Sequence, residues 1–359
     1  MIVRFSLQSF FSVILLAVCV GQTPAEITPR SADKAPLAHE ALMLDIARAG
    51  ERYVAVGERG HVVISRDGKN WQQAESVPVS ATLTSVSFTG GRMWAVGHDT
   101  TIISSHDLGN TWKIQHFEPE WERPLLDVHF SNGREGFAVG AFGLLMRTTD
   151  GGESWEVADI GDVVTSEAID WEETAQDEQA LGDAEDDLVG DWDDDLYDAE
   201  TDFDRGCYEF HECHLNAILV ANNGDLMIAA ERGYGYRSRD GGDSWESFRF
   251  PYPGSMFGLL SVHDGVIAFG LRGNVQHSPN FGDDWELLDS PVEATLMSGA
   301  IGPNGQAVMV GARSTVLTFH SGTRQFSLSE DQLGSDYAAV VLTPEGSMIL
   351  VGEDGVTHE

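Results

Sequence analysis

The chain has 359 residues, of which 42% are hydrophobic, and 58 acidic residues against 21 basic ones give it a formal net charge of −37. This length and apolar content suffice for one large or two small globular domains. So strong a negative charge argues against nucleic acid as a partner, because binding to the phosphate backbone depends on lysine and arginine.

The N-terminal residues have the pattern of an export signal. Arg4 precedes an apolar stretch, and small residues end near Ala25. This stretch is too short for a membrane helix and predicts a signal peptide over residues 1–25. We therefore expect a periplasmic or secreted protein with no integral membrane span after signal removal. A lipoprotein signal is disfavoured because Val18, rather than a small residue, precedes Cys19.

From residue 53 onward the sequence repeats about every forty residues, in seven copies. Each copy has an apolar run closed by a glycine, at positions 57, 97, 140, 270, 311 and 352, with Ala230 in the fourth copy. The intervals are 40, 43, 90, 40, 41 and 41 residues, so one copy carries about fifty extra residues.

Each copy contains short β-rich runs between Gly- and Asp-containing turns, which indicate four antiparallel strands. A four-stranded unit at this period is typical of a propeller blade. The sequence therefore predicts an all-β fold: a seven-bladed β-propeller of four-stranded blades, forming one domain over residues 26–359. Because the last copy ends at Glu359 before a fourth strand, we expect residues roughly 30 to 40 to supply that strand and close the ring.

An Asp-containing turn precedes the last strand of most copies. It begins at Asp67, Asp107, Asp150, Asp240 and, with an amide instead of the acid, Asn280. Such an Asp can accept hydrogen bonds from backbone N–H groups two or three residues on, while glycine supplies a positive φ. Identical turns spread around a ring cannot converge on one substrate, so we interpret them as structural. We predict no catalytic residue, no metal and no cofactor.

The pattern Ser105-x-Asp107-x-Gly109-x-Thr111-Trp112 resembles the Asp-box, or BNR repeat. Together with "WAVG", the seven repeats and the secretory signal, it resembles the photosystem II stability and assembly factor family, which has relatives in non-photosynthetic bacteria. The resemblance implies a seven-bladed propeller that acts as a non-enzymatic assembly factor and holds newly made membrane subunits. The role in photosynthesis belongs to the family, and nothing in the chain points to a photosystem partner.

The resemblance also directs attention to one turn, because photosynthetic members bind their partner through an arginine patch on one face. In this chain the turn after the glycine of each copy holds arginine in four copies, at Arg59, Arg232, Arg272 and Arg313. Turns between second and third strands share one face of a propeller, so we expect these arginines to gather at one rim and bind an acidic partner. The alternative is that each makes local hydrogen bonds or ion pairs.

An acidic insert lies between the third and fourth copies. Residues 159–212 hold 22 Asp or Glu residues and one basic residue, Arg205, and so contribute −21 of the net charge. The insert is too charged to be well buried. We interpret it as a docking segment that folds over the arginine turns and competes with a ligand. A solvated linker and a calcium site are the alternatives.

Two cysteines flank the end of the insert. After signal removal Cys207 and Cys213 remain, an even number in a compartment where disulfides persist, so we predict that they pair. His211 and His214 beside them leave a metal site as an alternative, although the spacing matches no common zinc pattern.

These features favour a protein-binding scaffold or assembly factor for a membrane or envelope complex, acting as a monomer. One alternative is a carbohydrate-binding or degenerate sialidase-like propeller, which as a glycosidase would need two carboxylates paired across the central channel at about 5 to 9.5 Å. A second alternative is an accessory protein of a membrane exporter.

Overall fold

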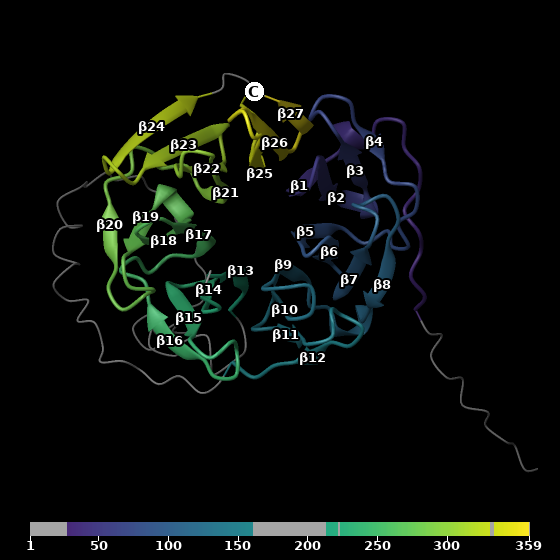
Figure 1. The fold of residues 1–359 in the computed structure, drawn as a ribbon, viewed down its shortest axis with the longest axis horizontal. Coiled ribbons are helices and arrows are strands. Elements are labelled where there is room, and N and C mark those ends of the chain that lie inside the picture. The colour runs from purple at the N-terminus through teal and green to yellow at the C-terminus, as the bar shows by residue number, and fades with distance from the viewer. Residues whose placement is uncertain (1–26, 161–212, 222, 331–333, 359) are drawn as a thin grey trace, which may run out of the picture.

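Seven antiparallel β-sheets surround a central axis in the computed structural model, which describes residues 27–160, 213–221, 223–330 and 334–358 (Figure 1). The predicted seven-bladed propeller is confirmed. In every sheet the strands pair in sequence order, and the first strand of each blade lies nearest the axis. No helix in the described ranges is long and apolar enough to cross a membrane. The signal peptide and nearly all of the acidic insert lie outside the described residues.

The innermost strands are β1 (Met43–Ala49), β5 (Leu83–Thr89), β9 (Leu125–Phe130), β13 (Leu215–Val220), β17 (Met256–Val262), β21 (Leu296–Ile301) and β25 (Tyr337–Leu342). The second strands are β2 (Arg52–Gly57), β6 (Arg92–Gly97), β10 (Gly136–Gly140), β14 (Leu226–Ala230), β18 (Gly265–Gly270), β22 (Ala307–Gly311) and β26 (Met348–Gly352). The third strands are β3 (Val62–Ser65), β7 (Thr101–Ser105), β11 (Leu145–Thr148), β15 (Tyr234–Ser238), β19 (Val275–Ser278), β23 (Thr315–His320) and β27 (Gly355–His358). The outermost strands are β4 (Gln72–Gln73), β8 (Lys113–His116), β12 (Glu156–Val157), β16 (Glu246–Arg249), β20 (Glu286–Leu288) and β24 (Gln325–Glu330). Short 3₁₀ turns are η1 (Ala38–Glu40), η2 (Glu58–Gly60), η3 (Pro119–Trp121) and η5 (Leu271–Gly273).

The hydrophobic core lies between the blades. The second strands are buried on both faces, because each blade packs its two faces against its two neighbours. Ala55 and Ile46 of the first blade share one apolar cluster with Ile349 and Val351 of the last blade. Side-chain packing between the first and last blades therefore closes the ring.

The expected fourth strand of the last blade is not found among the described residues, where this sheet has three strands. The prediction that residues 30–40 form that strand was wrong. Ala32 N–H donates to the Val77 carbonyl at 3.0 Å, and Ala35 N–H donates to Gln73 Oε1 at 2.9 Å, so this segment lies along the outer edge of the first blade. Pro36 lacks an N–H donor, and Ala and Asp have low strand propensity, which explains why the segment stays irregular.

The repeated glycine has a steric cause. A Cβ at Gly97 would lie 2.0 Å from the Thr82 carbonyl oxygen, just before the inner strand of the same blade. The same short approach occurs at the equivalent glycines, with 2.1 Å at Gly57 and 1.9 Å at Gly311. The second strand can end this close to the start of the first strand only where no side chain intervenes.

Candidate functional site

Six blades use the same two-residue turn between the second and third strands. In the first blade His61 N–H donates to the Glu58 carbonyl at 2.9 Å, while Arg59 has a φ of 55° and Gly60 a φ of 69°. Two consecutive positive φ values define a type I′ turn. The same pair of positive φ values occurs at Asp99–Thr100, Phe142–Gly143, Arg232–Gly233, Arg272–Gly273 and Arg313–Ser314. All four arginines singled out in the sequence occupy the first central position of this turn.

Arginine gives this turn no local advantage. The first position of a type I′ turn favours Asn, Asp or Gly, because other side chains are strained at a positive φ. The four arginine side chains are nevertheless exposed to solvent. Their presence at a strained position indicates a use outside the turn.

The turns lie on the same face of the ring as the connections between blades. Gly143 N–H donates to the Cys213 carbonyl at 2.9 Å, and Ser314 N–H donates to the Ser335 carbonyl at 3.0 Å. Cys213 and Ser335 belong to segments that join one blade to the next. Arg59, Arg232, Arg272 and Arg313 therefore share one rim of the propeller, and we call them the arginine rim.

The four guanidinium groups of the arginine rim form no ion pair or hydrogen bond with any other residue that the structure describes. Arg232 and Arg313 make polar contacts only through main-chain atoms: the Arg232 carbonyl accepts from Arg249, and Arg313 N–H donates to Asp336. The local ion pairs considered as the alternative are thus not part of the described structure.

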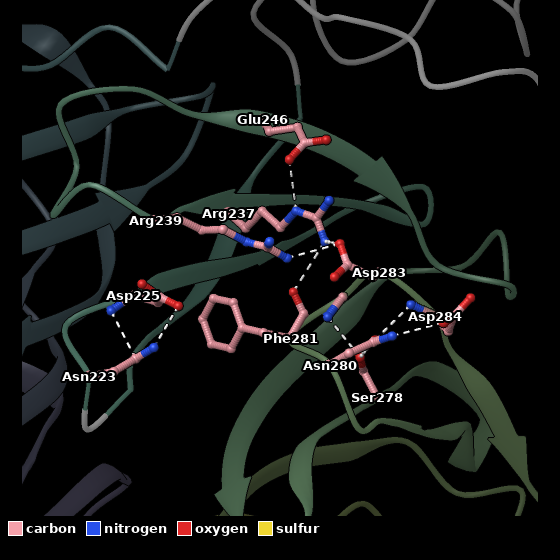
Figure 2. A network of polar contacts seen from close by, with 11 residues as sticks. Asn223, Asp225, Arg237, Arg239, Glu246, Ser278, Asn280, Phe281, Asp283 and Asp284 are labelled. Atoms are coloured by element: carbon pink, nitrogen blue, oxygen red, sulfur yellow. Dashed lines mark hydrogen bonds and ion pairs between the residues drawn. The ribbon is translucent and has the colours of Figure 1, made fainter.

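Several arginines on the opposite face are paired, although Arg48 and Arg66 are exposed there and form no ion pair within the described residues. Arg237 is only 8% exposed, and its guanidinium lies 2.9 Å from Glu246 and 2.7 Å from Asp283 of the next blade (Figure 2). It also donates to the Phe281 carbonyl at 3.2 Å. Two further bridges join neighbouring blades in the same way, Arg92–Glu153 at 3.4 Å and Arg147–Asp243 at 2.7 Å. On this face arginine therefore links one blade to the next.

The partners of these linking arginines lie in the Asp-containing turns. Asp150 accepts hydrogen bonds from the backbone N–H and the hydroxyl of Ser154, at 3.0 and 2.7 Å, and from the Thr148 hydroxyl at 2.9 Å. These hydrogen bonds hold the pKa of Asp150 well below its usual range. Asp107 and Asp240 accept the same bonds, also from the residue four positions on.

The first and fifth copies vary this arrangement. Asp67 accepts from Lys69 N–H and Asn70 N–H, two and three residues on, as the sequence suggested for all copies. Asn280 accepts from Asp284 N–H at 2.8 Å. The regular copies close a longer loop because one more residue separates the acid from the Trp.

Two carboxylates meet on the innermost strands, which the sequence analysis did not single out. The Ser85 hydroxyl donates to Asp127 at 2.9 Å and also hydrogen-bonds Asp45. Burial raises the pKa of Asp45 to about 7, against the effect of its hydrogen bonds, and also raises the pKa of Asp127. The available signal was an acid in the middle of an apolar strand, in "MLDIA" and "LLDVH".

Both carboxylates link inner strands of neighbouring blades. Asp45 accepts from Ile46 N–H at 2.8 Å and from Val86 N–H of the second blade at 2.7 Å. Asp127 accepts from Val128 N–H and, across the next seam, from Ile218 N–H, both at 2.8 Å. Every carboxylate oxygen is thus occupied by a main-chain donor.

Cys213 is buried and disulfide-bonded. Its predicted partner Cys207 and the neighbouring His211 lie outside the described residues. Within the described ranges no group of three or more His, Cys, Asp and Glu side chains could hold a metal ion.

No protein family model matches the sequence. A stretch of 84 residues is 34% identical to a protein of Synechococcus sp. (strain RCC307) named photosystem II assembly lipoprotein Ycf48, and it covers 23% of this chain and 25% of that relative. The match therefore spans about a quarter of the relative's length.

Several solved structures share the fold. "YCF48 bound to D1 peptide" superposes with a TM-score of 0.62 at 16% identity, covering 92% of this chain and 98% of that chain. YCF48 from Cyanidioschyzon merolae superposes with a TM-score of 0.61 at 15% identity, covering 88% of this chain and 94% of that chain. A streptogramin B lyase superposes with a TM-score of 0.66 at 10% identity, covering 89% of this chain and 94% of that chain. Because this neighbour is an enzyme, the fold alone does not separate binding proteins from enzymes. The partial sequence match and the shared fold confirm the resemblance to a photosystem II assembly factor-like propeller.

Proposed function

We propose that this chain is a non-enzymatic propeller that binds an acidic segment of a partner protein through the arginine rim. The observation that carries the proposal is the recurrence of exposed arginine at the same turn position of four blades, on one rim. Arg92, Arg147, Arg237 and Arg239 on the opposite face pair with acids of the next blade, whereas the four arginines of the rim are exposed and form no ion pair within the described structure. In a chain of net charge −37, a set of free cations on one face suits a negatively charged partner.

We further propose that this binding serves the assembly or stability of a membrane or envelope complex, in the periplasm or outside the cell. Two similarities support this role: the partial match to a protein named as an assembly lipoprotein, and the shared fold with a propeller described as bound to a D1 peptide. The apolar stretch that follows Arg4 supports export.

The strength of single exposed ion pairs suits transient binding. One such pair contributes roughly 0.2 to 1 kcal/mol, so four contribute on the order of 1 to 4 kcal/mol. The contribution falls with salt, because the Debye length is about 8 Å at physiological ionic strength. An assembly factor must release its client, and a rim of exposed arginines gives an affinity that permits release.

The test compares two variants that remove the same charge. In the first variant Arg59, Arg232, Arg272 and Arg313 are replaced by Gln; in the control the exposed Arg48, Arg66, Lys69 and Lys113, which lie away from the rim, are replaced by Gln. Binding of a fluorescein-labelled twelve-residue Glu/Ser peptide is measured at 20 and 300 mM NaCl. We expect the rim variant to lose at least ten-fold in affinity at low salt and the control to lose less than two-fold. Equal losses would mean that the peptide responds only to net charge, and the proposal would be abandoned.

One observation favours a second candidate, a glycosidase, because Asp45 and Asp127 form a carboxylate pair with raised pKa values. Their oxygens are occupied by main-chain N–H groups, which supports a role in holding the blades together. If the wild type releases reducing sugar from polysaccharides and the Asp127→Asn variant does not, the non-enzymatic proposal fails.

A further inference from the structure

The arginine rim is interrupted at the third blade by an aromatic residue. Phe142 occupies the turn position that holds arginine in four other blades, with the same positive φ of 55°. Its ring is 42% exposed and meets the His214 ring edge-on, with centroids 5.3 Å apart. A large apolar side chain in so exposed a turn adds nothing to the core of its own blade.

A second exposed ring belongs to the connection that leads into the same blade. Trp121, at the end of η3, is 40% exposed, and its ring lies 5.6 Å from that of His116 at the end of β8. We call Trp121, Phe142, His116 and His214 the aromatic sector.

The parts of the aromatic sector are joined through the backbone of the third blade. Ala141, next to Phe142, donates its N–H to the carbonyl of Pro124 at 2.9 Å, three residues after Trp121. The turn that holds Phe142 is thus bonded to the connection that carries Trp121, while the backbone of that connection is also bonded to the turn of the second blade, where Glu118 N–H donates to the Asp99 carbonyl at 3.0 Å. On the other side, His214 N–H donates to the Glu231 carboxylate at 2.9 Å, beside Arg232. The aromatic sector thus runs up to the first of three successive arginine-bearing blades.

The aromatic sector has features of an anchor site. Trp and Phe rings lose little conformational entropy when they bind, and such residues dominate binding energy in many interfaces. Each exposed ring is already positioned by a histidine. Burial lowers the pKa of His116, whose Nε2 has no hydrogen-bond partner in the described structure, so that ring is neutral at neutral pH. An apolar side chain of the partner that packs against the His116 ring would therefore not be placed beside a charge.

We infer that the aromatic sector is the anchor subsite of the arginine rim: it takes one apolar or aromatic side chain of an acidic peptide whose carboxylates then reach Arg232 and Arg272. This inference rests on the proposed function, because the acidic segment is bound there by the rim. It specifies that the bound segment contains an apolar or aromatic residue as well as acids, and that the segment lies on the rim in one orientation. The anchoring residue lies at one end of the acidic run, since the aromatic sector lies beside the fourth blade and the arginines continue away from it.

The test uses three fluorescein-labelled twelve-residue peptides of Glu and Ser: one with Phe near the N-terminus, one with Phe near the C-terminus and one with Ser in both places. The variants are Phe142→Asn, which tolerates a positive φ, and Phe142→Arg, which installs the residue of the sister blades. Leu287→Asn, on the outer edge of the fifth blade and 57% exposed, is the matched control. Thermal unfolding of each variant verifies the fold.

On the wild type we expect one Phe peptide to bind at least five-fold more tightly than the Ser peptide. Phe142→Asn should remove that preference while leaving the affinity for the Ser peptide within two-fold, and Leu287→Asn should change neither. Phe142→Arg should bind the Ser peptide more tightly, with a steeper salt dependence, and show no preference for Phe.

Two results would overturn the inference in distinguishable ways. If the acidic peptides bind through the arginine rim but all three bind equally, the aromatic sector is not an anchor and the proposed function stands. If no acidic peptide binds in an arginine-dependent way, both fail together.

Discussion

Replacing Asp45 with Asn should reverse its effect on stability between acid and neutral pH. Burial between the inner strands of the first two blades raises the pKa of Asp45 to about 7, and the nearby Asp127 carboxylate adds repulsion. In the unfolded chain the pKa is about 3.9. Because the folded state holds the proton more tightly, this group's contribution to stability is fully present below about pH 4 and is lost as the pH rises through 7.

The size of the effect follows from the shift. Three pKa units correspond to about 4 kcal/mol, an upper limit because the Asp45 side chain is partly accessible to solvent. Asn keeps one acceptor for Val86 N–H or Ile46 N–H but turns an NH₂ group toward the other donor, which costs about 1 kcal/mol. The variant should therefore be less stable than the wild type by about 1 kcal/mol at pH 3.5, nearly equal to it at pH 4.5, and more stable by up to about 3 kcal/mol at pH 8.

Urea unfolding followed by tryptophan fluorescence at pH 3.5, 4.5, 6, 7 and 8 measures both curves. Glu51→Gln, which removes an exposed carboxylate from the turn after β1, is the control for net charge and should follow the wild type. The acids of the Asp-containing turns are common to all three proteins and cancel in the difference. Curves for the wild type and Asp45→Asn that stay parallel across this pH range would refute the reasoning.

The remaining predictions concern the links between strands and between blades. Gly97→Ala should destabilise the protein by at least about 2 kcal/mol, since its Cβ would lie 2.0 Å from a carbonyl oxygen, whereas Gly322→Ala, with nothing within 4 Å, should cost less than about 0.5 kcal/mol. Equal melting temperatures for the two would contradict the steric account. Arg237→Met should cost about 1 to 2 kcal/mol, because it removes two ion pairs and the hydrogen bond to the Phe281 carbonyl, while Arg324→Met breaks one exposed pair and should cost less than about 1 kcal/mol. Urea denaturation distinguishes these values, and a larger loss for Arg324→Met would count against the bridging role.

The fold could be predicted because the sequence pattern of each blade lies within one short stretch of the chain and is repeated seven times. Each blade forms from strands adjacent in sequence, so a period of forty residues with a glycine at its centre defines the unit. The repeated glycine marks the position where the end of the second strand lies too close to the carbonyl before the inner strand for a side chain, and this contact recurs in six blades. The arginine positions could likewise be placed on one rim, because topology alone assigns the turn after the second strand to one face.

Contacts between distant segments could not be predicted in this way. The path of residues 30–40 depends on main-chain donors and acceptors near Val77, which no local pattern reveals. The pairing of Asp45 with Asp127 through Ser85 depends on three blades meeting at the axis. The aromatic sector was also missed, because the sequence analysis considered only the copies with arginine at this turn, and the contacts of Phe142 with His214 and of Trp121 with His116 join residues that no repeat pattern brings together.

The distribution of charge has a consequence for how a partner would approach. Outside the acidic insert the chain still carries a net charge of −16, so an acidic segment is repelled by most of the surface. On the Asp-turn face Arg92, Arg147, Arg237 and Arg239 offset little of this repulsion for a ligand, since acids of the next blade pair with them. The arginine rim gathers four unpaired cations at one turn position, so it favours productive encounters on that face, while repulsion by the rest of the surface lowers the total affinity. Neutralising exposed acids away from the rim should therefore raise the affinity for an acidic peptide while reducing its dependence on Arg232 and Arg272; unchanged dependence on these two arginines would show that repulsion has no part in directing the partner.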